Sequence, residues 1–325
     1  MAELTMIEAI NEAMRQEMER DSRIIVLGED VGENGGVFRA TDGLLEQFGE
    51  GRVFDTPLAE SGIIGTSIGL AINGMRPIAE IQFLGFAYQA MDQLAAQAAR
   101  IRFRSAGRFS CPIVVRSPYG GGVRTPELHS DSLEALFTHS PGLKVVMPSN
   151  PYDAKGLLIS AIRDEDPVLF LEPMKLYRAF RMEVPQEPYT VPLGQARVVK
   201  EGDDVTIISW GATVPLVAKI AAEIETKGVS AEVIDLRCLQ PLDLDTIIAS
   251  VEKTGRVMIV HEAVKTGGFG AEVAALISER ALFSLSAPIV RIAGYDTPYP
   301  VPSVEDDWLP NAERIAEGIE TLLRY

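Results

Sequence analysis

The sequence predicts an α/β fold with two domains, in which mainly parallel sheets are flanked by helices. Three observations support this prediction. The chain has 325 residues, more than one ordinary hydrophobic core holds and fewer than three domains need. Short runs rich in β-branched residues alternate with helical stretches from end to end. These runs are almost continuously apolar, which is typical of parallel strands covered on both faces.

The first part of the chain contains the clearest elements. The expected strands are the apolar runs 23–30, 78–85, 112–118, 143–149 and 167–173, and the expected helices are 61–74 and 151–166. The second helix has a distinct start signal. Asn150 is suited to cap it, Pro151 stands where its missing N–H costs nothing, and Asp153 complements the helix dipole. The charged N-terminal stretch predicts an amphipathic helix and not a secretion signal.

A segment rich in Pro, Gly and charge then interrupts the alternation and predicts a linker over residues 186–203. We therefore expect a first domain over residues 1–185 and a second over 204–325. The second domain repeats the α/β pattern. Its expected strands are 204–211, 231–237, 255–262 and 287–294, with helices ending at Gly228 and spanning 243–253.

Composition narrows the function classes. Lys and Arg total 30 and Asp and Glu total 46, giving a formal net charge of −16 that argues against nucleic-acid or anionic-membrane binding. No apolar run approaches the roughly 18 residues that span a bilayer. The only cysteines, Cys111 and Cys238, exclude a disulfide framework and suit a reducing cytoplasm. With His129, His139 and His261 the only histidines, chemistry is expected from carboxylates, one or two histidines, or a bound cofactor.

Two glycine clusters do not match a phosphate-binding motif, because no P-loop or dinucleotide fingerprint surrounds them. Gly62, Gly65 and Gly69 recur at helical spacing and predict close helix packing. The run 120–122 predicts a loop that bends or moves, with a glycine-rich loop beside a functional site as the alternative.

Glu60 and His129 are the candidate catalytic residues, and each has two interpretations. Glu60 begins an apolar helix, where an acidic residue also simply matches the positive end of the dipole. His129 lies in a loop before Asp131 and Glu134, which are spaced as a capping box. It could equally be a solvated loop histidine, so the residues alone leave both interpretations open.

Several longer strings carry a more specific signal. Their positions are 27–41, 54–65, 79–86, 119–132, 151–173 and 234–243. Over essentially the whole chain they resemble the β subunit of the thiamine-diphosphate-dependent component of 2-oxoacid dehydrogenase complexes, nearest to the bacterial α2β2 pyruvate dehydrogenase type. The resemblance implies a pyrimidine-binding domain followed by a transketolase-type C-terminal domain, which agrees with the predicted division.

The resemblance also implies roles for single residues. Glu60 falls on the glutamate that hydrogen-bonds N1′ of the cofactor's aminopyrimidine ring. Gln82 and Phe86 fall on residues that line and stack against this ring, and Leu58 is placed nearby. His129 falls on the histidine that acts as acid and base around decarboxylation and acyl transfer to lipoamide. A carboxylate on N1′ suits this chemistry, because it helps the cofactor's amino group to remove the C2 proton.

The family further implies a structural potassium ion held largely by backbone carbonyls. The matching positions are Ile113, Ala161, Ile162, Asp164 and Asp166. The Gly-Asp-Gly motif that holds magnesium and diphosphate is missing, and the nearest string, 201–204, lacks its second glycine. In the family that motif belongs to the α subunit. We therefore expect half a cofactor site, inactivity of the lone chain, and an α2β2 heterotetramer in which the α subunit binds Mg²⁺.

A second partner is expected at the C-terminus. Residues 296–325 hold seven acidic and two basic residues, so this tail and Tyr325 are candidates for docking the basic subunit-binding domain of the lipoyl acyltransferase. A solvated helix face explains the charges equally well.

The expected substrate is a small 2-oxoacid. Pyruvate is favoured by phenylalanine in the string 83–86, where branched-chain relatives tend to carry tyrosine. Branched-chain and acetoin dehydrogenase subunits, a transketolase-like C2 transferase and a non-catalytic assembly scaffold remain alternatives. Joint retention of Glu60, Gln82, Phe86 and His129 speaks against the scaffold.

Overall fold

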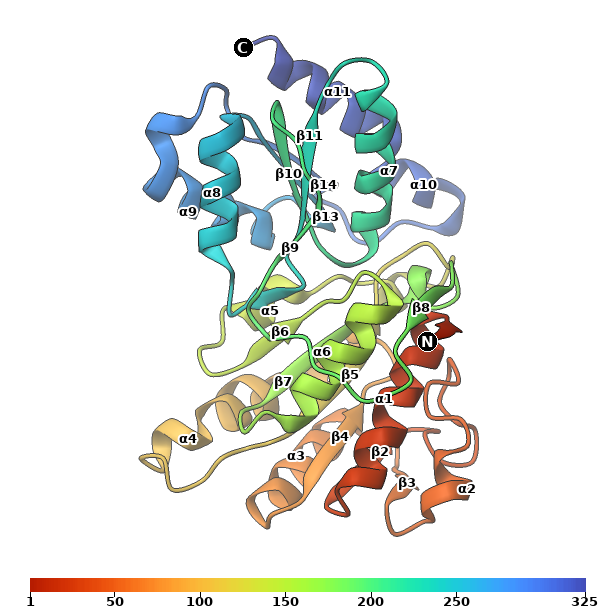
Figure 1. The fold of residues 1–325 in the computed structure, drawn as a ribbon. Coiled ribbons are helices and arrows are strands. Elements are labelled where there is room, and N and C mark those ends of the chain that lie inside the picture. The colour runs from red at the N-terminus through yellow and green to blue at the C-terminus, as the bar shows by residue number, and fades with distance from the viewer.

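The computed structural model describes residues 1–325 and contains two α/β domains, with the first below the second in Figure 1. The first domain is built on a seven-stranded sheet of order β12-β6-β7-β5-β4-β2-β3. All neighbours in it are parallel except the pair of β12 and β6. Its strands are β2 (Ile24–Gly28), β3 (Val53–Asp55), β4 (Arg76–Glu80), β5 (Val114–Tyr119), β6 (Lys144–Val146), β7 (Val168–Pro173) and β12 (Cys238–Gln240).

Helices cover both faces of this sheet. They are α1 (Met6–Arg20), α2 (Leu44–Phe48), α3 (Glu60–Ile72), α4 (Ile101–Arg104), α5 (Glu134–Thr138) and α6 (Pro151–Arg163). Along β7, Val168 and Phe170 pack with the core under α1 and α6, whereas Leu169 and Leu171 pack with the core that includes α3. This alternation is the two-residue period of a strand buried on both faces, as the apolar runs predicted.

The start of α6 is as expected. The Asn150 side chain accepts a hydrogen bond from the Asp153 N–H at 2.9 Å, and Pro151 occupies the first turn. At the N-terminus, Thr5 and Glu8 form a capping box that begins α1. A small antiparallel pair of β1 (Ala2–Leu4) and β8 (Met182–Val184) lies beside α1.

The second domain has a five-stranded sheet of order β14-β13-β10-β11-β9. Its strands are β9 (Arg197–Lys200), β10 (Val205–Ser209), β11 (Ala231–Asp235), β13 (Val257–Val264) and β14 (Val290–Gly294). Its helices are α7 (Val214–Glu225), α8 (Leu244–Thr254), α9 (Phe269–Ala281), α10 (Glu305–Trp308) and α11 (Ala312–Leu323). No helix in the molecule is long and apolar enough to cross a bilayer.

The two domains share a core and a sheet. Trp210 and Phe269 of the second domain belong to the same buried cluster as Leu169 of the first. The strand β12 leaves the second domain and pairs antiparallel with β6 of the first. The strand β9 falls inside the segment 186–203 that was expected to be a linker, yet it is the edge strand of the second sheet. An apolar interface of this kind favours one rigid unit.

One local expectation was wrong. The expected strand 78–85 ends at Glu80, and a 3-10 helix over Leu84–Ala90 follows. This segment is pressed against the next loop, since a Cβ at Gly85 would lie 1.9 Å from the Leu128 carbonyl oxygen.

The glycine stripe of α3 packs closely against no element of this chain. A Cβ added at Gly69 would meet no heavy atom within 4 Å, and one at Gly65 would meet only Gln93, at 4.0 Å. The residues Gly62, Gly65 and Gly69 are exposed, so they mediate no close helix packing within this chain.

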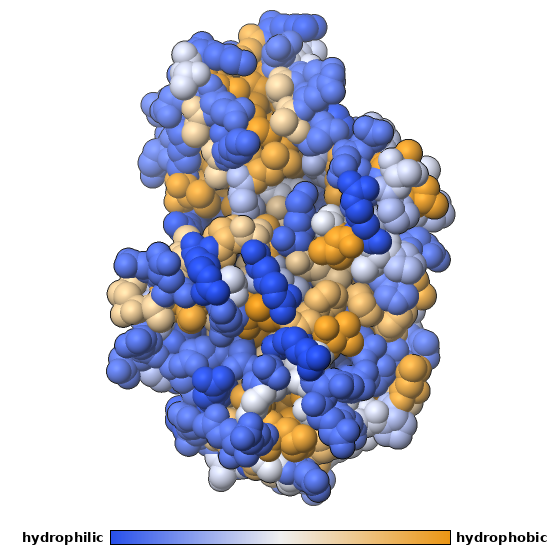
Figure 2. Space-filling model, turned by 90° about the vertical axis from the view of Figure 1, so that its right-hand side faces the viewer, coloured by the Kyte–Doolittle hydropathy of each residue, from blue (hydrophilic) through white to orange (hydrophobic).

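The face of the molecule that carries α1, α2 and α10 mixes hydrophilic (blue) and hydrophobic (orange) side chains, and apolar side chains gather near its mid-height (Figure 2).

Candidate active site

Four of the expected site residues lie at the carboxyl-terminal edge of the first sheet. Gln82 follows β4, His129 follows β5, and Glu60 is the first residue of α3, which leaves the edge strand β3. Parallel strands present ligand sites at this edge. The helix α3 packs against the 3-10 helix that carries Phe86, so the sheet topology brings these segments together.

Glu60 is buried, with 2% of its surface exposed, and its Oε2 has no hydrogen-bond partner. Glu29, which follows β2, is also buried, and its Oε1 lacks a partner as well. Burial raises the pKa of Glu29, and the nearby charge of Glu60 raises it further. Two adjacent buried carboxylates with free oxygens form a site that can share protons with a bound group. Sequence reasoning missed Glu29, which lay near the end of the predicted strand 23–30 and follows the observed strand β2 directly.

His129 lies at the end of a 3-10 helix, Glu127–His129, and packs against two aromatic rings. Its ring centroid is 4.5 Å from that of Phe83 and 5.0 Å from that of Phe86, both edge-on. Its Nδ1 is buried without a partner. The solvated-loop interpretation of His129 therefore does not hold, since the ring is half-buried and held by aromatic contacts. Phe83 was not among the predicted site residues.

The remaining predicted residues differ in their surroundings. Gln82 donates from Nε2 to Asp30 at 3.0 Å. Leu58 is 77% exposed, so a role at the cofactor requires a further surface to cover it. The capping box expected from Asp131 and Glu134 is absent, because Leu133 occupies the cap without a side-chain bond. Glu134 instead is buried.

The buried Glu134 carboxylate contacts the second domain. Trp210 donates from Nε1 to Glu134 at 3.2 Å, and its indole stacks on His261 at 5.0 Å. Burial lowers the pKa of His261 to about 3, so this histidine stays neutral near pH 7. Its place in the core explains why it takes no part in the candidate site.

A buried ion network lies among β4, β5 and β7. Arg116 is fully buried and donates to Glu80 at 2.7 Å and to Glu172 at 2.7 and 2.9 Å. Tyr177 donates to Glu172 at 2.6 Å and packs its ring against Phe38 at 5.2 Å. The network thus connects β4, β5 and β7 with one another and, through Tyr177, with the segment that contains Phe38.

The five residues expected around potassium meet where α6 ends and β5 begins. Arg76 donates to the Ile162 carbonyl at 3.0 Å and to the Asp164 carbonyl at 2.5 Å. Asp166 pairs with Arg102 at 2.6 Å. A carbonyl oxygen accepts two bonds, so these two carbonyls each keep a free lone pair, whereas the Asp164 carboxylate is paired with Lys144 at 2.5 Å. No cluster of three or more His, Cys, Asp or Glu side chains in the molecule could hold a metal ion.

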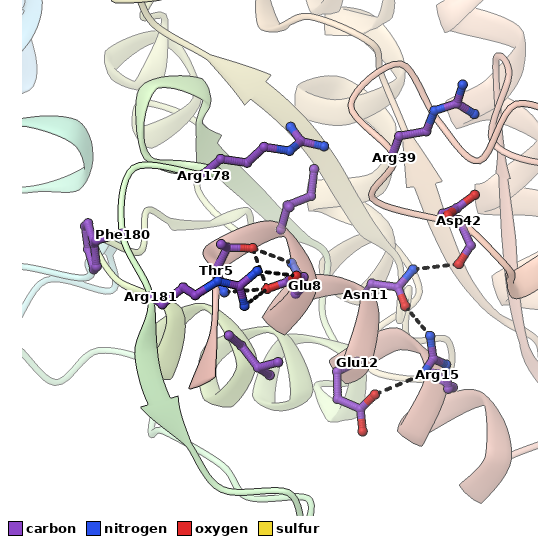
Figure 3. A pocket seen from close by; sticks show the side chains of 12 residues that line it. Thr5, Glu8, Asn11, Glu12, Arg15, Arg39, Asp42, Arg178, Phe180 and Arg181 are labelled. Atoms are coloured by element: carbon purple, nitrogen blue, oxygen red, sulfur yellow. Dashed lines mark hydrogen bonds and ion pairs between the residues drawn. The ribbon is translucent and has the colours of Figure 1, made fainter. Parts of the chain in front are cut away.

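A separate cavity of about 680 Å³ lies beside α1 (Figure 3). Its arginines are mostly engaged by neighbours. Arg181 pairs with Glu8 at 2.9 Å, Arg15 pairs with Glu12 at 3.2 Å, and Arg178 donates to a backbone carbonyl at 2.7 Å. The cavity contains none of the candidate site residues, and the pair of Arg181 with Glu8 connects α1 to the segment before β8.

Fold and site together define a transketolase-like protein. Residues 2–179 match the model of the transketolase pyrimidine binding domain, and residues 194–315 match that of the transketolase C-terminal domain. A split-gene transketolase, solved as an inactive β4 tetramer, has a TM-score of 0.81 at 23% identity and covers 99% of both chains. A transketolase from Pichia stipitis has a TM-score of 0.72 at 14% identity, covering 100% of this chain and 47% of its own.

Curated relatives narrow the family. The chain is 58% identical over 325 residues to the pyruvate dehydrogenase E1 component subunit beta of Bacillus subtilis, covering 100% of both chains. The subunits of the same name from Staphylococcus epidermidis and Staphylococcus aureus are 58% and 57% identical at the same coverage. The chain therefore belongs to the family of pyruvate dehydrogenase E1 β subunits. This confirms the resemblance and the predicted fold class.

Proposed function

We propose that this chain is the β subunit of a thiamine-diphosphate-dependent pyruvate dehydrogenase, which decarboxylates pyruvate oxidatively and passes the acyl group to a lipoyl carrier. The observation that carries the proposal is Glu60, a buried carboxylate at the start of α3 with a free oxygen. Identity of 58% and 57% to subunits named for pyruvate supports the substrate. It favours pyruvate over branched-chain 2-oxoacids and acetoin, and an enzyme over a scaffold.

The residues present fit the aminopyrimidine half of thiamine diphosphate. When bound, the cofactor supplies a carbon nucleophile and accepts the electron pair left by departing carbon dioxide. Glu60 would hold a proton at N1′ with its unpartnered Oε2. Burial and the negative charge of Glu60 raise the pKa of the adjacent Glu29, so the two carboxylates are electrostatically coupled. Gln82 and Phe86 line the ring, and the apolar packing of Phe86 with Phe83 excludes water from it.

His129 is proposed as the acid that protonates the leaving sulfur of the lipoyl group during acyl transfer. Its imidazole is oriented by Phe83 and Phe86, and its buried Nδ1 is free to bind a proton or substrate atom. Positioned proton transfer of this kind contributes about 10²- to 10⁴-fold in rate.

The other half of the site is proposed to come from an α subunit in an α2β2 heterotetramer. This chain lacks the Gly-Asp-Gly motif, so Mg²⁺ and the diphosphate are assigned to the α subunit. Exposed apolar and glycine surface beside Glu60 supports such a partner. Leu58 is 77% exposed, Tyr88 is 50% exposed, and the glycine face of α3 is open to close approach by another chain.

Two finer assignments accompany this proposal. A structural potassium ion is proposed at the carbonyls of Ile113, Ala161 and Ile162 with Asp164 and Asp166, where the carbonyls retain a free lone pair. The acyltransferase is proposed to dock on the acidic tail. Glu313, Glu317 and Glu320 project from α11, whose apolar side is buried, and Tyr325 is 66% exposed.

Carbon dioxide release from pyruvate, with thiamine diphosphate and Mg²⁺ added, tests the proposal. The lone chain is expected to show no turnover, and the chain co-expressed with its α subunit is expected to be active. Turnover by the lone chain would contradict the half-site. Inactivity of both preparations on pyruvate, with or without activity on a branched-chain 2-oxoacid, would contradict the pyruvate assignment.

The variant His129→Ala is expected to lower acyl transfer to lipoamide by about 10²-fold or more, because the positioned proton donor is lost. Decarboxylation measured with an artificial electron acceptor should fall less, since that route needs no protonation of a lipoyl sulfur. The comparison uses His139→Ala, an exposed histidine at the end of α5, as its control. Unchanged transfer in His129→Ala would remove the residue from the mechanism.

A further inference from the structure

The loop that carries His129 is held by the second domain. In this loop, the Gly121 N–H donates to Oε1 of Glu262 at 2.5 Å, and the Gly122 N–H donates to Oε1 of Glu305 at 3.1 Å. Ser132 approaches Glu262 from the other end of the loop at 3.4 Å. Two buried carboxylates therefore accept bonds from groups on both sides of the histidine, at positions 121, 122 and 132.

This contact explains the glycine run. Gly120 and Gly122 have φ values of +85° and +89°, which favour glycine. A Cβ at Gly120 would lie 2.6 Å from Oε1 of Glu262, and one at Gly121 would lie 1.6 Å from the Tyr299 hydroxyl. The run expected to let the loop bend or move is instead packed closely against the second domain.

Glu262 and Glu305 are themselves fixed. Tyr299 donates to Oε1 of Glu305 at 2.7 Å and stacks edge-on against Trp308 at 5.0 Å. Glu262 projects from β13, which is paired on both sides, with β14 and β10, in the second domain's sheet. The acceptors thus belong to rigid elements, whereas the donors belong to a loop, so the second domain sets the position of the loop.

We propose that Glu262, supported by Glu305, is a positioning residue for His129. This positioning role rests on the proposed function, because the effect of losing Glu262 is measured as a change in acyl transfer. Neither carboxylate touches the reacting atoms. Each acts by fixing the backbone on which the histidine stands, and a displacement of about 1 Å at a reacting group costs on the order of 100-fold in rate.

Charge around Glu262 gives the proposal a pH dependence. The groups that face it are Tyr119 of β5, Glu134 of α5, Lys175, Tyr299, and the Gly121 N–H and Ser132 hydroxyl of the loop. Burial raises the pKa of Glu262 to about 7, and the Glu134 charge adds to the rise, while the Gly121 N–H and Lys175 oppose it.

The loop's own contacts, from the Gly121 N–H and the Ser132 hydroxyl, lower the pKa of Glu262 against the rise caused by burial. Closure of the loop is therefore most favourable while Glu262 is ionised, and it is weakened as the pH falls through about 7. Hydrogen exchange of residues 119–132 in the assembled enzyme, corrected for the intrinsic rate, is expected to quicken as the pH falls from about 8 to about 6. In Glu262→Gln, whose amide accepts the same bond without titrating, the exchange rate should stay at the level that the wild type shows at the lower pH.

The decisive variant is Glu262→Met, which leaves the buried Gly121 N–H without an acceptor. Local opening of 119–132 is expected to increase by about 10- to 100-fold, which is the usual consequence of a lost buried partner. Acyl transfer to lipoamide should fall by about 10-fold or more, with a smaller loss of decarboxylation with an artificial acceptor. Glu262→Gln, which keeps an acceptor for the Gly121 N–H, should recover a large part of both. Asp306→Asn, which breaks only the exposed pair with Arg124, serves as the control.

Each outcome decides one of the two proposals. Wild-type loop exchange and acyl transfer in Glu262→Met would overturn the positioning role, as would an equal loss of both activities without a change in exchange. If the wild-type enzyme transfers no acyl group at all, the proposed function fails, while the exchange experiment still tests whether Glu262 holds the loop. Should Glu262→Met fail to assemble, Glu305→Gln and the pH comparison with Glu262→Gln test the same contact.

Discussion

In the assembled enzyme, Glu60→Gln is expected to lower decarboxylation by about 10²- to 10⁴-fold while folding and assembly persist. The amide has the size of the carboxyl but cannot take up or release the N1′ proton. The carboxylate is buried at the first position of α3 and has no partner inside the chain for Oε2, so the substitution breaks no hydrogen bond at that oxygen. Loss of its favourable contact with the helix dipole costs at most about 1 kcal/mol.

The measurement is carbon dioxide release from pyruvate, with assembly checked by sedimentation and folding by thermal unfolding. Glu46→Gln is the matched control, because Glu46 is also a first-turn glutamate but is exposed on α2. Near wild-type turnover of Glu60→Gln would contradict the role of Glu60. A loss shared by Glu46→Gln would indicate a general electrostatic effect and would also count against it.

The fold was predictable where local signals were sufficient. The run 167–173 is apolar at each position from Val168 to Leu171, and this alone indicates a strand buried on both faces. Asn150 and Pro151 marked the start of α6 for reasons confined to one helical turn. By contrast, β9 and β12 gain their strand pairing from partners far along the chain, in β11 and β6. Short segments of this kind have no periodic signal of their own.

The candidate site was predictable from the resemblance more than from residue patterns. Local chemistry left Glu60 and His129 with two interpretations each, and only the three-dimensional arrangement placed His129 between Phe83 and Phe86. Glu29 was missed because a carboxylate after a strand is common, and its importance depends on the burial it shares with Glu60.

Glu262 illustrates the same limit. The residues around Glu262 in the sequence are typical of an ordinary core strand. Nothing in them indicates a contact with Gly121, which lies 141 positions earlier. The triple glycine was visible, but its packing partner was not. In this triple glycine the absence of side chains permits a close approach to Glu262 and Tyr299, not motion.

The second large effect is expected from Arg116→Met, which should lower the free energy of unfolding by about 3–5 kcal/mol. The substitution leaves Glu80 and Glu172 buried without their cation, at 4% and 0% exposure. Globular proteins are stable by only about 5–15 kcal/mol, so a large part of the total is at risk. Tyr177, which donates to Glu172, cannot replace the lost charge.

The loss should depend on pH. Burial already raises the pKa of Glu80 and Arg116 opposes that rise, so without the arginine the Glu80 carboxyl should protonate more readily. A folded-state pKa above the ordinary value means that stability is retained at low pH and lost as the pH rises. Urea unfolding should therefore show a larger deficit for Arg116→Met at about pH 8 than at about pH 5.

Two comparisons make the experiment specific to the buried network. Arg23→Met removes an arginine whose pair with Asp21 is exposed, and it should change stability by less than about 1 kcal/mol. Adding Glu80→Gln and Glu172→Gln to Arg116→Met should recover part of the loss, because no uncompensated charge then remains buried. A deficit of Arg116→Met that matched that of Arg23→Met at both pH values would show that the network contributes packing alone.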